Sequence, residues 1–242
     1  GGMGGGNITL GSGALTAGDT TNTTFSGVIS GPSGSFTKTG TGTLTLSGTN
    51  TYEGATGING GTLKTTGTDT LDNATDVTVA GVANYTVGAA DTIQSLDNSG
   101  TTTLNADLTT TSLNGAGGLE LNANTITAQS GSYDGSITGT GTLTKTGSGI
   151  LTLSGTVDNG AVNLKGGTFK LGADNRIANT SQVNFDGGTF DTNNFNEGDA
   201  SNSGIGTLKL VSDSTINFSG TADTLRFKND NGSTGGALDI QN

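Results

Sequence analysis

The stretch "GTGTLTLSGTNTYEGATGINGGTLK", residues 40–64, decides the fold. Much of it returns later in the chain as "GSGILTLSGTVDNGAVNLKGGTFK", residues 147–170. In both copies, leucines alternate with threonines, and glycines follow each short run. Alternation with period two is typical of a half-buried strand, and glycine marks the places where the backbone turns. The stretch therefore predicts a repeated unit of short strands.

The repeat extends beyond this stretch. The two copies cover residues 25–64 and 133–170, and a partial echo, "VNFDGGTFDT", stands at 183–192. Small deletions fall in the turns, while the apolar alternation stays in phase; a one-residue slip inside a strand would reverse every side chain. This behaviour indicates stacked strand coils. The matched positions are Phe25 with Tyr133, Ile29 with Ile137, Phe36 with Leu143, Lys38 with Lys145, Leu44 with Leu151, and Leu46 with Leu153.

The composition limits the kind of core that the chain can build. Of 242 residues, 45 are glycine, and only 29% are hydrophobic and 5% aromatic. A compact globular domain has about 45–50% apolar residues, so the composition disfavours a thick two-layer core. Disorder is also disfavoured, because charge is sparse and the apolar residues alternate regularly. A thin core, spread along an axis and without disulfides, fits both observations, since cysteine is absent.

These features distinguish three all-β architectures. A sandwich needs larger apolar clusters, and a propeller needs blade-length repeats of about 40–50 residues. In a β-solenoid, each coil pairs its backbone with its neighbours around a narrow apolar column. We therefore predict an elongated, parallel, right-handed β-helix that forms a single module over residues 1–242. About twelve coils of about 20 residues would stack to about 50–60 Å. The segment "GADNRIANTSQ" (172–182) is expected to be a polar loop with Ile177 tucked inside.

Residues 40–64 resemble the autotransporter-associated β-strand repeat, also called the passenger-associated transport repeat. Its usual form is G-x-G-x-L-x-L-S-G-x-N-x-Y-x-G-x-T-x-I-x-x-G-x-L. The chain departs from this form at Gly57, and its second copy has "TVDNG" where "TNTYEG" stands in the first. The matching residues are Gly40, Gly42, Leu44, Leu46, Ser47, Gly48, Asn50, Tyr52, Gly54, Ile58, Gly61 and Leu63.

The resemblance implies a location and a class of function. Proteins with this repeat form secreted or surface-displayed bacterial stalks, in adhesins and auto-aggregating proteins, commonly attached at the outer membrane. We therefore expect an extracellular or cell-surface passenger that acts in adhesion, auto-aggregation or biofilm formation. Its partners would be host surfaces, neighbouring cells or their glycans, held by many weak contacts along a polar face.

The residue inventory argues against an enzyme. Without histidine or cysteine, neither a Ser-His-Asp nor a Cys-His arrangement can form, and imidazole cannot bind a metal. Paired carboxylates would suffice for glycoside hydrolysis, and oxygen ligands for Ca²⁺. The densest acidic patch holds Asp186, Asp191, Glu197 and Asp199. We interpret it as a solvated loop, leave incidental Ca²⁺ binding open, and predict no catalytic residue, metal-binding residue or cofactor.

Charge and hydropathy limit the partners further. A net charge of −11 disfavours nucleic acid, whose phosphates need clustered lysine and arginine. No apolar run has the roughly 18 residues of a membrane span. We expect Lys38 and Lys145, in the repeated "TKTG", on exposed strands, where charge discourages stray pairing. Thr-x-Thr pairs are expected to face solvent, although stacked rows of threonine could also bind ice.

Two other functions remain open at this level. Neither end of the chain shows an evident polar cap, and the uncapped edge of a β-helix offers a template for further strands. The alternative to a stalk is therefore a self-assembling subunit of an extracellular fibre or surface layer, stacked head-to-tail or packed laterally. A polysaccharide-active enzyme is the third possibility.

Overall fold

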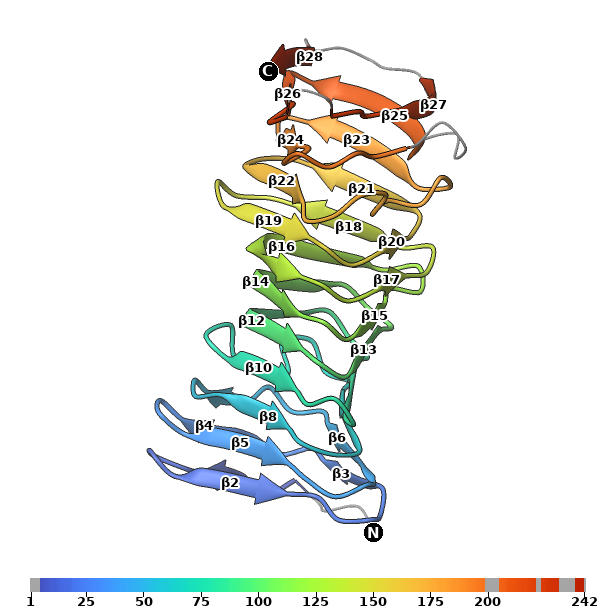
Figure 1. Ribbon diagram of the computed structural model, residues 1–242. Coiled ribbons are helices and arrows are strands. Elements are labelled where there is room, and N and C mark those ends of the chain that lie inside the picture. The colour runs from blue at the N-terminus through green and yellow to red at the C-terminus, as the bar shows by residue number, and fades with distance from the viewer. Residues whose placement is uncertain (1–4, 199–204, 221–222, 231–237, 242) are drawn as a thin grey trace. The chain divides into compact units, whose positions relative to one another are not determined.

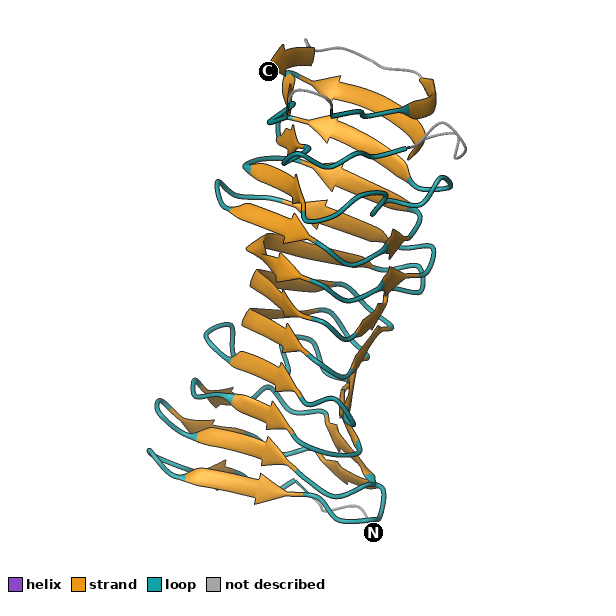
Figure 2. Ribbon diagram, in the orientation of Figure 1, coloured by secondary structure: helices purple, strands orange, loops and turns teal. Residues whose placement is uncertain are grey.

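The computed structural model describes residues 5–198, 205–220, 223–230 and 238–241. The chain divides into two units, residues 1–120 and 121–242, which are described separately. Strands and loops make up both, and the residues described include no helix (Figure 2).

Unit 1 winds through three short strands in each of its first three coils (Figure 1). The first coil holds β1–β3, the second β4–β6 and the third β7–β9. The later coils hold two strands each. The bounds are β1 (Ile8–Thr9), β2 (Ala14–Ala17), β3 (Thr23–Phe25), β4 (Ile29–Gly31), β5 (Ser35–Lys38), β6 (Thr43–Leu46), β7 (Thr51–Tyr52), β8 (Thr56–Ile58), β9 (Thr62–Thr65), β10 (Asp76–Val79), β11 (Asn84–Val87), β12 (Asp91–Asn98), β13 (Thr101–Leu104), β14 (Leu108–Gly115) and β15 (Gly118–Glu120).

Parallel pairing between successive coils fixes the register of unit 1. Ile8 pairs with Ile29, Leu15 with Phe36, and Phe25 with Leu46. Apolar residues therefore stack on apolar residues in a column, because a parallel pair keeps the phase of the side chains from one coil to the next.

Unit 2 has the same parallel stacking. Its long first strand, β16, pairs with β18 through its first half and with β19 through its second half. The bounds are β16 (Thr125–Tyr133), β17 (Ile137–Thr138), β18 (Thr142–Lys145), β19 (Ile150–Leu153), β20 (Val157–Asp158), β21 (Ala161–Leu164), β22 (Thr168–Leu171), β23 (Gln182–Asp186), β24 (Thr189–Asp191), β25 (Ile205–Ser212), β26 (Ser214–Asn217), β27 (Phe227–Asp230) and β28 (Leu238–Gln241).

The partial echo at 183–192 lies directly against the coil before it. Val183 pairs with Val162, Phe185 with Leu164, and Phe190 with Phe169. The rings of Phe169 and Phe190 stack with centroids 5.4 Å apart. The echo therefore repeats the inward residues of its neighbour, as in-register stacking requires.

The parallel β-solenoid is confirmed, with about 11 turns against the twelve expected. Buried and half-exposed positions alternate along most strands, so one apolar residue in two fills a narrow interior. Ile177 is buried in its loop and forms a bridge with Val157, which confirms the expectation for residues 172–182. The handedness and the single module over 1–242 stay predictions.

Candidate functional site

A buried lysine closes the corner between β5 and β6. Lys38 is 1% exposed, and its Nζ donates hydrogen bonds to the carbonyl oxygens of Thr39 at 2.7 Å and Gly40 at 3.1 Å. A third bond, of 3.0 Å, reaches Gly60 O in the next coil. The ammonium group thus satisfies carbonyls from two successive coils that would otherwise lack donors.

The second copy builds the same corner between β18 and β19. Lys145 is fully buried, and its Nζ donates to Thr146 O at 2.6 Å, Gly147 O at 3.2 Å and Gly166 O at 3.0 Å. Burial lowers the pKa of both lysines, because desolvation disfavours the charged form. We call each lysine with its three carbonyls a lysine corner.

Repeated glycines make room for the lysine corners. Gly61 and Gly167 follow the acceptor glycines at matching places and have φ angles of 59° and 61°. An added Cβ at Gly61 would lie 2.4 Å from Gly42 O, and one at Gly167 would lie 2.4 Å from Gly149 O. Both the positive φ and this close approach exclude larger residues.

The lysine corners correct the expectation that Lys38 and Lys145 are exposed. Strand parity is the physical reason. Phe36 and Lys38 stand two residues apart on β5, as Leu143 and Lys145 do on β18, so each lysine shares the inward face with an apolar residue. Three backbone acceptors then compensate for the loss of hydration.

A second interior device is a side-chain acceptor for backbone N–H groups of the preceding coil. Asn50 Oδ1 accepts from Ile29 N at 2.9 Å. Asp91 Oδ2 accepts from Leu71 N at 3.2 Å, and Glu197 accepts from Arg176 N at 2.7 Å and from Ile177 N at 3.2 Å. The same structural task is therefore done by an amide once and by buried carboxyl groups twice.

Burial perturbs both carboxyl groups. Desolvation raises the pKa of Asp91 to about 7, against the lowering effect of its bonds from Leu71 N and Thr92 N. Desolvation likewise raises the pKa of Glu197 to about 7, opposed by the bonds from Arg176 N and Ile177 N. The sequence analysis did not single out Asp91. Asp91 and the buried Ile93 stand two residues apart on β12, and this alternation could have predicted that Asp91 faces inward.

The predicted acidic patch does not converge on one point. Asp186 accepts a hydrogen bond from Ser212 Oγ at 3.0 Å, and Asp191 accepts from Asn193 N at 2.8 Å. Glu197 turns inward, as described above, and Asp199 lies outside the described residues. Within the described ranges, no three potential metal-ligating side chains lie together.

A polar surface covers one side of unit 1. Its outward positions on β3, β6, β9, β11 and β13 stack in register, between inward residues such as Leu44, Leu63 and Tyr85. Successive residues in each column lie about 4.8 Å apart. We call this surface the threonine face; it consists of Thr24, Thr43, Thr45, Thr62, Lys64, Asn84, Thr86, Thr101 and Thr103.

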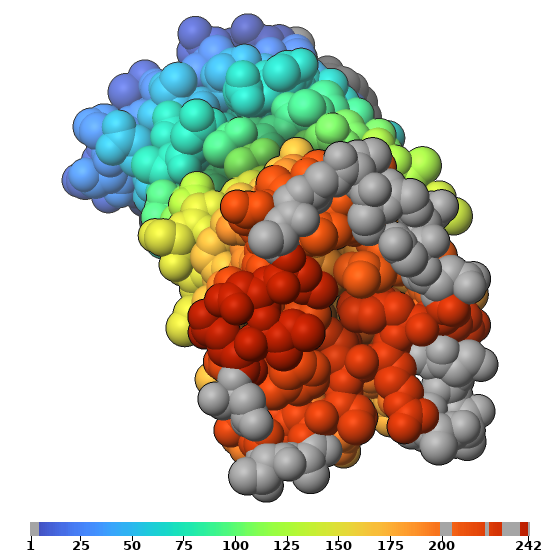
Figure 3. Space-filling view, turned by 90° about the horizontal axis from the view of Figure 1, so that it is seen from above, coloured from blue at the N-terminus to red at the C-terminus, as the bar shows by residue number. Residues whose placement is uncertain are grey.

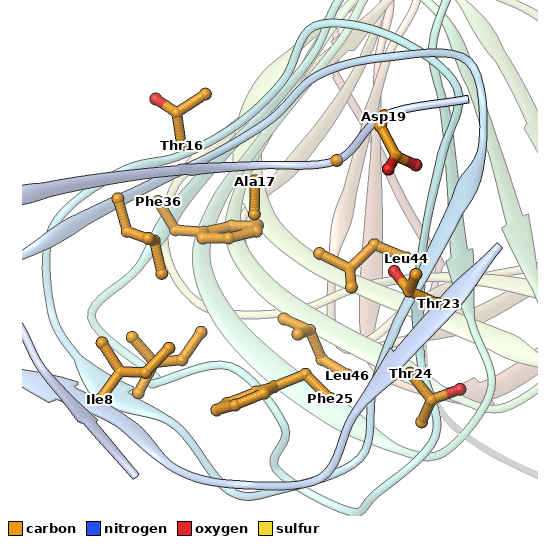
Figure 4. Close-up of a pocket in the computed structure, with 13 residues that line it drawn as sticks. Ile8, Thr16, Ala17, Asp19, Thr23, Thr24, Phe25, Phe36, Leu44 and Leu46 are labelled. Carbon is orange, nitrogen blue, oxygen red and sulfur yellow. The ribbon is translucent and has the colours of Figure 1, made fainter. Parts of the chain in front are cut away.

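An apolar cavity of about 460 Å³ opens at the first coil of unit 1. Figure 4 shows Ile8, Phe25, Phe36 and Leu46 pointing into it, while Thr16 and Thr24 point away. Asp19 lies at its rim. The cavity continues the apolar column of unit 1, and Asp19 is the one titratable residue among those that line it.

The comparisons with known proteins agree with this architecture. The family model of the passenger-associated-transport-repeat matches residues 36–64 and 143–171. These two segments contain both lysine corners, the strands β6–β8 and β19–β22, and all but one residue of β5, β9 and β18. No solved structure matches the chain.

One curated relative is the adhesin BmaC autotransporter of Brucella suis biovar 1 (strain 1330). The chain is similar to it at 33% identity over 238 residues, which are 93% of this chain. The same residues span 6% of the relative's length. In the described part of the chain, no helix is long and apolar enough to cross a membrane.

Proposed function

Because the chain belongs to the passenger-associated-transport-repeat family of surface-displayed autotransporter passengers, we propose that it is an adhesive segment that binds glycan-bearing cell surfaces. The threonine face carries this proposal. The similarity of the chain to a protein named an adhesin supports an adhesive function.

The threonine face has the chemistry for many weak contacts. Each threonine hydroxyl can donate one hydrogen bond and accept two, which suits the hydroxyl groups of sugars. Parallel stacking holds the hydroxyls at regular spacing, so little conformational entropy is lost on binding. Individually weak bonds then add up through multivalency along the face.

Charge directs the choice of ligand. Lys64 is the one cationic side chain on the threonine face, and the chain as a whole has a net charge of −11. Polyanionic ligands would be repelled at long range, whereas neutral or weakly charged glycans would not. Auto-aggregation and biofilm formation would follow if the glycans of neighbouring cells are also bound.

The test is binding of the purified chain to immobilised neutral glycans and to cultured cells. A triple variant, Thr45→Val, Thr86→Val and Thr103→Val, removes hydroxyls from the threonine face and keeps the strand-favouring shape. The matched control changes Thr16, Thr37 and Thr78 to valine; these residues lie in outward positions of β2, β5 and β10.

The proposal predicts at least a tenfold loss of binding for the face variant and unchanged binding for the control. Equal binding by both variants would show that another surface is used. Failure of the unaltered chain to bind any glycan or cell surface would overturn the adhesive function itself.

A further inference from the structure

The corner between β8 and β9 contains an asparagine followed by a glycine, Asn59-Gly60. In this dipeptide, the backbone nitrogen of the glycine can attack the side-chain amide carbon of the asparagine, because glycine has no Cβ to obstruct the approach. The structure separates the reactive copies of the dipeptide from the protected ones. The sequence has four copies, Asn59-Gly60, Asn114-Gly115, Asn159-Gly160 and Asn231-Gly232, and the last lies outside the described residues.

Asn59-Gly60 is open to this attack. The Asn59 side chain is exposed, and among the described residues neither its amide group nor Gly60 N has a hydrogen-bond partner. Residues from this part of unit 1, light blue to cyan, lie at the surface in Figure 3. The neighbouring groups are held, since Asn59 N donates to Lys38 O at 2.9 Å and Lys38 Nζ donates to Gly60 O at 3.0 Å. The reacting amide and nitrogen are therefore the free groups of an otherwise fixed corner.

The other two described copies are protected. Asn159 is 4% exposed, and Gly160 N, the atom that would attack, donates to Gly141 O at 3.0 Å. Asn114 lies within β14, and its Nδ2 donates to Ser112 Oγ at 2.9 Å. Reaction at either copy requires local opening of the coil first, and such opening is rare in paired strands.

From this contrast we propose that Asn59 is a site of spontaneous deamidation. Gly60 N forms a bond to Cγ of Asn59, the Cγ–Nδ2 bond breaks, and Nδ2 leaves as ammonia with the proton from Gly60 N. Water then opens the cyclic imide at one of its two carbonyl carbons and leaves aspartate or isoaspartate. The step takes up water and releases ammonia, and it needs no oxidant or reductant.

The modification acts on the lysine corner of the first copy. Isoaspartate adds a carbon atom to the backbone directly before Gly60, whose carbonyl oxygen is the acceptor that Lys38 reaches in the next coil. That acceptor is displaced, so the lysine corner is weakened. Either product also adds a negative charge shortly before Thr62, which belongs to the threonine face.

The second copy has the same corner without the reactive residue. Lys165 stands where Asn59 stands in the first copy, its backbone N donates to Lys145 O at 2.9 Å, and Gly166 O accepts from Lys145 Nζ at 3.0 Å. A lysine side chain has no amide carbon to attack. Asn59→Lys is therefore a matched variant that keeps the corner and removes the reaction.

The experiment ages the purified chain at mildly alkaline pH, where Gly60 N loses its proton more readily. Peptide mass spectrometry follows the conversion of Asn59, Asn114 and Asn159 over time, and enzymatic methylation of isoaspartate identifies that product. The same chain unfolded in urea is the reference, because all three copies are then equally accessible. Urea unfolding of aged and fresh chains measures the effect on stability.

The proposal predicts conversion at Asn59 about tenfold or more faster than at Asn114 and Asn159 in the folded chain, and similar rates at all three in urea. The urea midpoint of the unaltered chain falls as Asn59 converts, whereas that of Asn59→Lys stays constant with age.

Two results would overturn the proposal. Conversion of Asn59 no faster than that of Asn159 in the folded chain would show that the corner restrains the reaction. A urea midpoint that stays constant while isoaspartate accumulates at Asn59 would exclude the effect on the lysine corner. Neither measurement involves a glycan, so the outcome is independent of the proposed adhesive function.

Discussion

Two parts of the solenoid have the same backbone arrangement but different interiors. Between residues 52 and 110, unit 1 buries many polar side chains, including Thr56, Asp91 and Thr110. Between residues 162 and 190, unit 2 buries mainly apolar ones, and the rings of Phe169 and Phe185 both contact the ring of Phe190. The strands of both parts pair in parallel with the next coil.

The comparison shows what a solenoid interior requires. The backbone hydrogen bonds are completed between successive coils. The side chains therefore have only to fill the interior and to satisfy the hydrogen bonds of any buried polar groups. In unit 1, Tyr52 Oη and Thr56 Oγ1 lie 2.7 Å apart, and Thr110 Oγ1 donates to Ser112 O at 2.9 Å. Thr102 has a buried hydroxyl without a hydrogen-bond partner among the described residues, so this part of the polar interior contributes less to stability.

The largest effect is expected from Phe169→Ala in the aromatic interior. Removing the ring leaves a cavity between Leu151 and Phe190, the residues that pair with Phe169 on either side. We expect a loss of about 3–5 kcal/mol, because surrounding side chains fill such a cavity only partly. Urea unfolding followed by circular dichroism measures it, and a loss below about 1 kcal/mol would show that the aromatic packing matters little.

The buried carboxyl groups predict a dependence of stability on pH in both parts. Each pKa is raised on folding to about 7. The folded state therefore holds protons that the unfolded state has released, and the stabilisation present below about pH 4 is lost as pH rises through 7. Each group contributes of the order of 3 kcal/mol by this linkage.

Replacing each carboxyl group by its amide tests this pH dependence. Asp91→Asn and Glu197→Gln should each flatten the pH profile of the free energy of unfolding and raise stability at pH 8. Asn50 already performs the same bonding task as an amide. A steady rise in the stability of the unaltered chain from pH 5 to pH 8 would contradict the assigned direction.

The lysine corners sharpen the comparison, because the same device stands in both units. Lys38→Met and Lys145→Met each leave three carbonyl groups without their donor, at a cost of about 2–3 kcal/mol. The two losses should be similar despite the different interiors. Lys165→Met, at an exposed position, is the control and should change stability by less than about 0.5 kcal/mol. If neither Lys38→Met nor Lys145→Met changed the free energy of unfolding, the interpretation of both lysines as exposed would be restored.

The smallest effect is expected in the polar interior. Thr102→Val replaces an unpaired buried hydroxyl by a methyl group of similar size. We expect stability to stay constant or rise by about 1 kcal/mol, since no hydrogen bond is lost. A loss of more than about 1 kcal/mol in the urea midpoint analysis would mean that Thr102 has a partner inside the solenoid.

The fold followed from the sequence because alternation and glycine spacing report directly on strands and turns. Leu44, Leu46 and Ile177 are buried as the pattern predicted. The lysine corners were missed because charge was given more weight than parity at Lys38. The bonding of Glu197 lay beyond sequence reasoning, since it depends on the path of a loop that carries no alternation.

The in-register stacking of coils is tested most directly by a spin-label distance on the threonine face. Thr24 and Thr103 stand in one column, with Thr45, Lys64 and Thr86 between them. The chain has no cysteine, so nitroxides on Thr24→Cys and Thr103→Cys label these sites alone. Double electron–electron resonance should give a narrow distribution centred at about 19 Å, four inter-strand spacings. A distribution centred beyond about 30 Å would contradict the stacked solenoid.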